Sequence, residues 1–295
     1  MRSIHFGPVD VDLERDGARC RIGPDEAPAA TEYVELPIRY LGRVTQQHRR
    51  AHRATLPGDT TSTPAVLRGL PACPLYPYHV PELGLRNDVY RRPLATALDR
   101  LGLGAGWSCV DVGAGAGDVS VALARLVGRT GRIYAVDSDP RARDTVAAAA
   151  AAAGEAQVLA ITQAGEDLRL PETVDLAFCR FLLMHVSDPA MVLHRMASVL
   201  RPGGYLVAQE PITTAGRVGG LAMSMPDAKH PDIGALLPGL VRAAGLELVD
   251  AWAEAPAGAG PGAVATYLEE LTEVDPGDDS VVLPPLVTVI GRQPA

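Results

Sequence analysis

The stretch Val110-Asp-Val-Gly-Ala-Gly-Ala-Gly-Asp118 joins a short apolar segment to an amphipathic one. Residues 108–112 have the composition of a buried strand, and residues 118–127 carry apolar side chains at helical spacing. The three alternate glycines between them allow a tight turn in which the backbone passes close to a ligand. The sequence therefore predicts a strand, a glycine turn and a helix, with a binding site at the turn.

The same alternation of short apolar strands and longer helices continues along the chain. It predicts strands at 133–136, 158–161, 174–178, 205–208, 246–251 and 286–290. It also predicts helices at 85–101 (with the regular part starting at Pro93), 141–153, 189–200 and 232–244. Strands that alternate with helices of ten or more residues favour an α/β fold with a parallel sheet and right-handed crossovers.

The first 85 residues have a different character, with ten prolines and no long periodic segment. We expect a hairpin at 9–13 and 18–22 that turns at Asp16-Gly17, and a helix over 31–54 that is interrupted at Pro37 or begins there. The predicted organisation is an irregular N-terminal arm or cap, 1–85, and a core, 86–295, with an insert at 212–229. Within the core, residues 255–261 are expected to form a flexible loop.

Composition excludes several classes of protein. The chain has 295 residues, of which 47% are hydrophobic and 21% charged, as in an ordinary globular protein. Its net charge of −8 argues against nucleic acid as a partner. The basic cluster at 46–53 leaves an RNA-modifying enzyme as a minor alternative, although a solvated helix face explains it better.

Neither a membrane span nor a signal peptide is evident, so we expect a cytoplasmic protein without membrane association. The four cysteines, Cys20, Cys73, Cys109 and Cys179, are widely spaced and have no histidine at metal-ligand spacing. We therefore expect no metal site, and Cys109 and Cys179 are expected to be buried in strands.

The acidic residues around the glycine turn indicate which ligand it suits. A dinucleotide-binding turn needs glycine at 118, where this chain has Asp118. Asp111 precedes the first glycine by two positions, and two acids near the turn suit a cationic ligand better than a pyrophosphate. A nicotinamide-dependent oxidoreductase is therefore disfavoured.

Two further acids follow later strands. Asp137 ends the strand at 133–136, where a carboxylate can accept both hydroxyls of a ribose. A helix N-cap is the alternative for Asp137, although Asp139 could fill that place. Glu166 follows the next strand and can accept from an adenine amine, or else lie in a solvated loop.

Taken in order, these segments resemble the class I S-adenosylmethionine-dependent methyltransferases. The matching segments are 111–117, Ala135-Val-Asp137, Gly165-Glu166 with Pro171, Phe178 to Asp188, and 200–207. The resemblance covers residues 86–211 well and 230–295 in outline. It implies a Rossmann-like sheet of seven mostly parallel strands with helices on both faces, whose last strand is antiparallel.

The resemblance also implies that S-adenosylmethionine is the cofactor and that particular residues bind it. Its methionine part would lie over the glycine turn, formed by Gly113, Ala114, Gly115 and Gly117. Asp111 would reach the ammonium group, and Tyr90 and Arg91 would approach the carboxylate. The residues implied for the nucleoside are Asp137, Ser138, Gly165, Glu166, Cys179 and Arg180, the last two through backbone groups.

Methyl transfer needs an acceptor held behind the methyl group with water excluded, and a general base where the acceptor is acidic. The candidates for that base are His185 and Glu210, although a histidine at this place is often a packing residue. His194 is expected to face outward.

The acceptor is expected to be a small organic molecule, possibly a secondary metabolite. The arm and the insert would select it, through Tyr76, Tyr78, His79, Met223 and Met225. The arm could also be exchanged within a homodimer. A protein that binds S-adenosylmethionine but catalyses a cyclisation or rearrangement would have the same cofactor half, and remains the alternative.

Overall fold

The computed structural model describes residues 2–6, 9–14, 17–22, 32–36, 80–223, 225, 228–272 and 275–295, with side chains from Leu85 onward. The chain divides into two compact units, Met1–Ala30 and Thr31–Ala295. The first unit is an antiparallel sheet of β1 (Arg2–Phe6), β2 (Val9–Glu14) and β3 (Gly17–Ile22). The hairpin formed by β2 and β3 confirms the predicted one.

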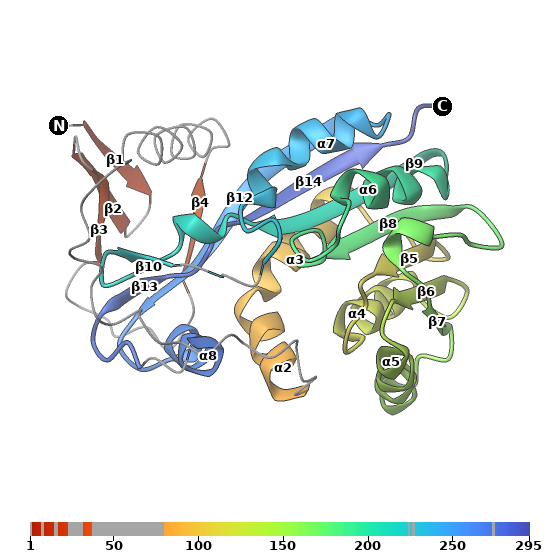
Figure 1. The fold of residues 1–295 in the computed structure, drawn as a ribbon, viewed down its shortest axis with the longest axis horizontal. Coiled ribbons are helices and arrows are strands. Elements are labelled where there is room, and N and C mark those ends of the chain that lie inside the picture. Colours follow the sequence, from red (N-terminus) through yellow and green to blue (C-terminus); the bar gives the residue numbers. More distant parts are fainter. Residues whose placement is uncertain are drawn as a thin grey trace, which may run out of the picture. The chain divides into compact units, whose positions relative to one another are not determined.

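The second unit is built on a mixed sheet whose central strands confirm the predicted Rossmann-like order. Five parallel strands come first: β7 (Val158–Thr162), β6 (Arg132–Asp137), β5 (Ser108–Val112), β8 (Val174–Arg180) and β9 (Leu200–Pro211). The last strand, β14 (Leu286–Arg292), lies antiparallel between β9 and β12 (Glu247–Ala259). Figure 1 shows these strands as one twisted sheet.

Helices cover both faces of this sheet (Figure 1). They are α2 (Val80–Val89), α3 (Arg91–Leu101), α4 (Asp118–Val127), α5 (Pro140–Ala153), α6 (Pro189–Ser198), α7 (Leu237–Ala243) and α8 (Ala263–Thr272). Alternate residues of a strand point to opposite faces, so Val110 and Val112 pack with α6 and α7, whereas Cys109 packs with α3 and α4. Asp111 follows the same alternation and points to the α4 side.

Three short 3-10 turns complete the unit, namely η2 (Gly165–Asp167), η3 (Thr213–Ala215) and η4 (Ile233–Leu236). Small strands also extend the sheet beyond its seven central strands. They are β4 (Glu32–Leu36), β10 (Arg217–Val218), β11 (Leu221–Ala222) and β13 (Ser280–Val282). None of them, nor α8, was predicted from the sequence.

The pairing of β4 corrects two predictions. Residues 255–259 were expected in a flexible loop, but they continue β12, because β4 pairs with residues 253–257 and β13 pairs with residues 257–259. A helix that begins at residue 31 is wrong, because Glu32–Leu36 is a strand, whereas a helix that begins at Pro37 is not contradicted. The remainder of that helix, and the basic cluster at 46–53, lie outside the described residues.

The predicted helix at 85–101 is two helices, α2 and α3, which meet at Tyr90. Pro93 was expected to begin the regular part, but α3 begins at Arg91 and Pro93 is its third residue. A proline is tolerated there because the first turn of a helix has no internal acceptor for its amide.

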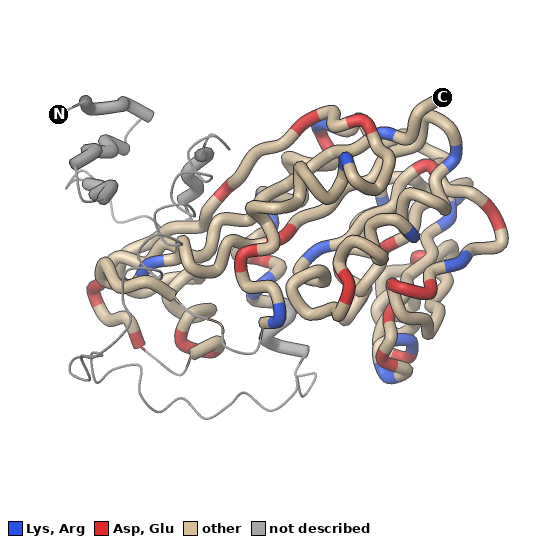
Figure 2. The backbone as a smooth tube through the Cα atoms, turned by 45° about the horizontal axis from the view of Figure 1, so that its top comes forward, with Lys and Arg blue, Asp and Glu red and all other residues tan. Residues whose placement is uncertain are grey.

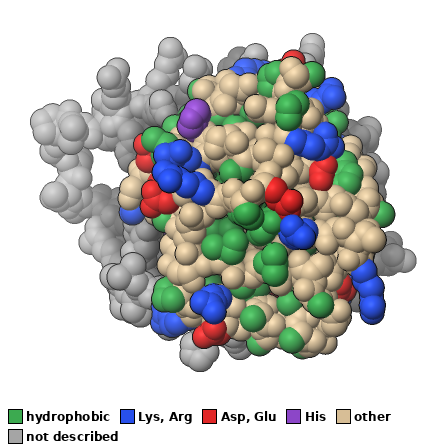
Figure 3. Space-filling view, turned by 90° about the vertical axis from the view of Figure 1, so that its right-hand side faces the viewer, with side chains coloured by type: hydrophobic (Ala, Val, Ile, Leu, Met, Phe, Trp, Pro, Cys, Tyr) green, Lys and Arg blue, Asp and Glu red, His purple; other side chains and the backbone are tan. Residues whose placement is uncertain are grey.

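Charge is dispersed over the described part of the chain. Figure 2 shows Lys and Arg interspersed with Asp and Glu around the periphery, without a face of one sign. The face in Figure 3 carries apolar side chains scattered between charges of both signs. No helix among the described residues is long and apolar enough to span a bilayer.

Candidate functional site

The glycine turn between β5 and α4 has a backbone that only glycine adopts readily. Gly113, Gly115 and Gly117 have φ of 78°, 53° and 88°, in the left-handed region. The amides of Gly113 and Ala114 both donate to the Val136 carbonyl, at 2.8 and 3.0 Å, which holds the turn against β6. A Cβ on Gly113 would also lie 2.9 Å from Leu182 Cδ1. The turn therefore presents bare backbone at the carboxyl ends of β5 and β6.

Asp137 ends β6 and is tied to this turn. Its Oδ2 accepts from the Gly115 amide at 2.9 Å, and its Oδ1 accepts from the Asp139 amide at 2.9 Å. Asp139 is the N-cap of α5, because its side chain accepts from the Arg141 amide at 2.8 Å. The helix-cap alternative thus applies to Asp139 and not to Asp137. Ser138, between them, is exposed.

Asp111 is a buried carboxylate beneath the turn, with 2% of its surface exposed. The Ser120 hydroxyl of α4 donates to its Oδ2 at 2.6 Å. Burial raises the pKa of Asp111 to about 6, although the Ser120 hydrogen bond and the Arg180 charge act in the opposite direction. This carboxylate has therefore lost hydration, and no cationic side chain among the described residues is in contact with it.

Arg180, the last residue of β8, is the buried cation nearby. Its Nη1 donates to the Tyr90 carbonyl at 3.3 Å, and its Nη2 donates to the Asn87 side-chain oxygen. Burial, together with the neighbouring Arg86 charge, lowers the pKa of Arg180 to about 10. Among the described residues, no ion pair joins Arg180 to Asp111 or Asp118.

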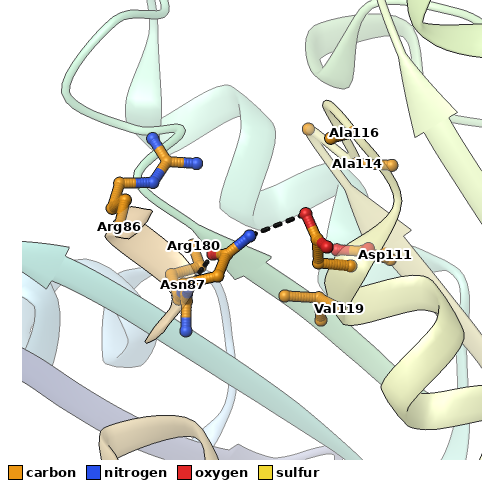
Figure 4. A pocket seen from close by; sticks show the side chains of 9 residues that line it. Arg86, Asn87, Asp111, Ala114, Ala116, Val119 and Arg180 are labelled. Atoms are coloured by element: carbon orange, nitrogen blue, oxygen red, sulfur yellow. Dashed lines mark hydrogen bonds between the residues drawn. The ribbon is translucent and has the colours of Figure 1, made fainter. Parts of the chain in front are cut away.

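These groups line one hollow, which holds about 310 Å³ of atom-free space, part of it open to solvent. Figure 4 shows Arg86, Asn87 and Arg180 on one side and Asp111 with the glycine turn on the other. Its lining residues are Arg86, Asn87, Asp111, Gly113, Ala114, Ala116, Asp118, Val119 and Arg180. Buried charges of both signs thus share one small space.

Two residues expected at this hollow lie elsewhere. Arg91 is exposed and pairs with Asp88 at 2.8 Å. Tyr90 is buried, and its hydroxyl donates to the Pro284 carbonyl at 3.0 Å. Arg86 and Asn87 of α2 line the hollow instead, each four positions before one of the expected residues. Helical spacing could have suggested them, because residues four apart share a helix face.

The residues expected around an adenine lie at the next strand ends. Gly165 is buried in η2, and a Cβ there would approach the Val192 side chain at 3.2 Å. Glu166 is partly exposed, and its carbonyl accepts from Arg195 Nε at 3.1 Å. Cys179 is buried in the apolar cluster on the α6 side, and burial raises the pKa of its thiol. Its side chain is therefore not available to a ligand. Cys109 is buried as well, as predicted.

A second hollow lies next to the first and shares Arg86 with it. It holds about 410 Å³ of atom-free space, part of it open to solvent. It is lined by Arg86, Tyr90, Phe181, Met184, His185, Pro211, Met225, Tyr267, Leu271 and Pro284. His185 is half-buried, and burial together with the Arg86 and Lys229 charges lowers its pKa, so the imidazole is neutral at pH 7.

Two other residues expected near the acceptor, Glu210 and Met223, do not line this hollow. Glu210 is fully buried at the end of β9 and lines neither hollow. Its Oε1 accepts from the Leu182 and Leu183 amides, both at 2.8 Å, so it holds the loop that precedes His185. Met223 packs in an apolar cluster, and His194 is exposed on α6 as predicted.

Comparison with known proteins finds a matching domain in the middle of the chain. Residues 110–208 match the family model described as a methyltransferase domain. The ubiquinone/menaquinone biosynthesis C-methyltransferase UbiE of Hahella chejuensis is 31% identical over 115 residues, 38% of this chain and 46% of that protein. An uncharacterized 37.1 kDa protein in a transposon of Streptomyces fradiae is 31% identical over 132 residues, 42% of this chain and 36% of that protein. The chain thus matches less than half the length of these relatives.

Solved structures agree in fold. A SAM-dependent methyltransferase from Aquifex aeolicus superposes with a TM-score of 0.51 at 19% identity, covering 72% of this chain and 97% of that one. YcgJ from Bacillus subtilis gives 0.52 at 15% identity, with 70% and 99% covered. Residues 110–208 therefore match a methyltransferase domain, and the sheet described above has the fold of these solved structures.

Proposed function

We propose that this chain binds S-adenosylmethionine with its methionine end in the first hollow and transfers the methyl group to a small organic acceptor. When bound, S-adenosylmethionine supplies a methyl group that its sulfonium charge has already activated. The observation that carries the proposal is the pair of buried, opposite charges on Asp111 and Arg180, which share one hollow without an ion pair between them.

The methionine end of the cofactor complements this pair. Its ammonium and carboxylate groups sit on one carbon atom, so both can be matched by an anion and a cation that face a common space. Asp111 would accept from the ammonium, and Arg180, held by Asn87 and the Tyr90 carbonyl, would donate to the carboxylate. The bare backbone of the glycine turn leaves room beneath the ligand.

The nucleoside would lie along the next strand ends. Asp137 has one hydrogen bond to each carboxylate oxygen, and each oxygen keeps a lone pair for a ribose hydroxyl. Glu166 would accept from the adenine amine, beside the buried Gly165. These assignments keep Asp111, Asp137 and Glu166, replace Tyr90 and Arg91 by Arg86 and Asn87 of α2, and use the side chain of Arg180 in place of its backbone.

The second hollow would hold the acceptor. Its lining is mainly apolar, and Arg86, which it shares with the first hollow, would place an acceptor beside the methionine end. A neutral His185 in that lining can take a proton from an acidic acceptor. We assign Glu210 to positioning, because it holds the amides of the loop before His185.

The test is methyl transfer from isotopically labelled S-adenosylmethionine to a panel of small phenols, carboxylic acids and amines, with S-adenosylhomocysteine measured in parallel. Equal amounts of labelled product and S-adenosylhomocysteine support the proposal. An acceptor that is converted while S-adenosylmethionine stays intact would instead establish a cyclisation or rearrangement on the same fold. Label recovered in RNA alone would establish the RNA-modifying alternative.

A further inference from the structure

The wall of the second hollow is mainly aromatic and apolar. The ring of Tyr90 packs edge-on against Phe181 at 5.1 Å and against Tyr267 at 6.3 Å between centroids. Because the Tyr90 hydroxyl donates to the Pro284 carbonyl, the ring and not the hydroxyl faces this cluster. Met184, Met225 and Leu271 complete the apolar lining. Such a wall suits an apolar molecule with a flat ring.

The polar part of this lining is positive. The guanidinium carbon of Arg86 lies 4.8 Å from the centroid of the Phe181 ring. Its Nε is buried and has no hydrogen-bond partner among the described residues. A buried donor without an acceptor destabilises the free protein, so an acceptor atom on a ligand would recover that free energy.

No acidic residue balances Arg86 within the lining. None of the ten described residues around the hollow is Asp or Glu. The nearby Glu210 lies behind the wall, where its Oε1 accepts from two backbone amides. Lys229, whose Nζ donates to the Ser187 hydroxyl, adds a second positive charge near His185. In the described lining of the second hollow, a cationic amine would therefore meet positive charge and no acidic side chain, whereas an anionic oxygen would be paired.

We propose that Arg86 selects the acceptor, and that the acceptor is an apolar ring compound with an anionic oxygen that pairs with the Arg86 guanidinium. The inference rests on the proposed function and narrows it from small organic molecules to apolar acids and enols. Arg86 is a binding residue in this account, because it touches the acceptor's charged end while the aromatic cluster holds the ring.

Three probes of one shape separate charge from hydrophobicity: 2-naphthoate, neutral naphthalene-2-carboxamide and the 2-naphthylmethylammonium cation. Each is titrated calorimetrically into the full chain saturated with S-adenosylhomocysteine. We expect 2-naphthoate to bind about tenfold or more tightly than the carboxamide, since a hydrogen bond to a charged group is worth at least that factor. The ammonium probe should bind most weakly.

Variants assign the preference to one residue. Arg86→Gln should reduce 2-naphthoate binding to that of the carboxamide, and Arg86→Lys should retain a preference for the anion. Arg143→Gln removes an exposed arginine on α5 and should leave all three affinities unchanged. If Arg86→Gln does not fold, the relative affinities of the three probes for the unmodified chain still test whether the hollow prefers an anion.

The outcomes separate this inference from the function on which it rests. A chain that binds S-adenosylhomocysteine but takes the carboxamide or the ammonium probe as well as 2-naphthoate overturns the acceptor class alone. An anion preference that survives Arg86→Gln overturns the role of Arg86. Failure of a folded chain to bind S-adenosylhomocysteine overturns the proposed function, and this inference with it.

Discussion

Replacing Asp111 by Asn should make cofactor binding both weaker and less dependent on pH. In the free protein burial raises the pKa of Asp111 to about 6, so the carboxyl is about nine-tenths ionised at pH 7 and about one-tenth ionised at pH 5. An ammonium group favours the ionised form, so binding draws the proton off Asp111. This contribution to affinity should therefore fall about tenfold from pH 7 to pH 5, or about 1.4 kcal/mol.

The Asp111→Asn change removes that titration, but its amide oxygen can still accept from the Ser120 hydroxyl, which donates to Asp111 at 2.6 Å. At pH 7 the loss of a charged acceptor for the ammonium should cost about 1.5–3 kcal/mol, which is a factor of about ten to one hundred in affinity. At pH 5 the two proteins should differ about tenfold less, because the wild-type carboxyl is then mostly neutral.

The assay is calorimetric titration with S-adenosylhomocysteine at pH 5, 6 and 7. Each titration is repeated in two buffers of different ionisation enthalpy, so that released protons are counted. The ratio of the affinities of wild type and variant is compared at each pH. Other titrating groups, such as Glu210 and His185, are present in both proteins, so their effect cancels in this ratio. Asp144→Asn, at an exposed carboxyl on α5, is the matched control. A ratio that stays constant with pH, or an Asp111→Asn variant that binds as tightly as wild type at pH 7, would refute the placement of the ammonium at Asp111.

Three further outcomes are expected. Asp137→Ala should weaken S-adenosylhomocysteine binding by about 1–3 kcal/mol in calorimetry, because the ribose acceptor and the anchor of the Gly115 amide are lost together; unchanged affinity would remove Asp137 from the site. Gly115→Val should lose binding, since a β-branched residue at φ 53° is strained, and wild-type affinity in a folded variant would contradict that role of the turn. Burial raises the pKa of Glu210 to about 7, so its contribution to stability is full below its ordinary pKa and is lost as pH rises through 7. In urea unfolding, the free energy of unfolding of Glu210→Gln should therefore rise relative to that of the wild type from pH 5 to pH 8, by up to about 3 kcal/mol. A difference in free energy of unfolding that does not change with pH would mean that Glu210 does not titrate in this range.

The glycine turn could be predicted from sequence because its signals are local. The boundaries expected for β5 and α4 match the structure, since an apolar run, three glycines and a helical pattern follow one another directly. The N-cap at Asp139 was likewise open to local reasoning, because the preference for Asp before a proline-led helix is a property of a few residues.

The strand character of residues 255–259 could not be predicted in this way. Their Ala, Gly and Pro content favours a loop, and only pairing with β4 and β13 makes them a strand. Those partners are far apart in sequence, so no local pattern records them. For the same reason β4 itself was expected to be helical.

The contribution of α2 to the site was missed because it depends on packing. The proline in the helical pattern over 85–101 suggested a boundary at Pro93, yet the chain leaves the helix at Tyr90, where the side chain packs against Phe181 and Tyr267. That break sets the orientation of α2 and brings Arg86 and Asn87 to the hollow. The burial of Arg180 likewise depends on the packing of α2, because Asn87 of that helix contacts its guanidinium.

The most direct test of the account is a titration of the purified full chain with S-adenosylhomocysteine, with NAD⁺ titrated under the same conditions. The account expects one site with micromolar affinity for the sulfur nucleoside and no binding of NAD⁺, since Asp111 and Asp118 beside the turn repel a pyrophosphate. No binding of S-adenosylhomocysteine by a folded chain, or equal binding of NAD⁺, would contradict it.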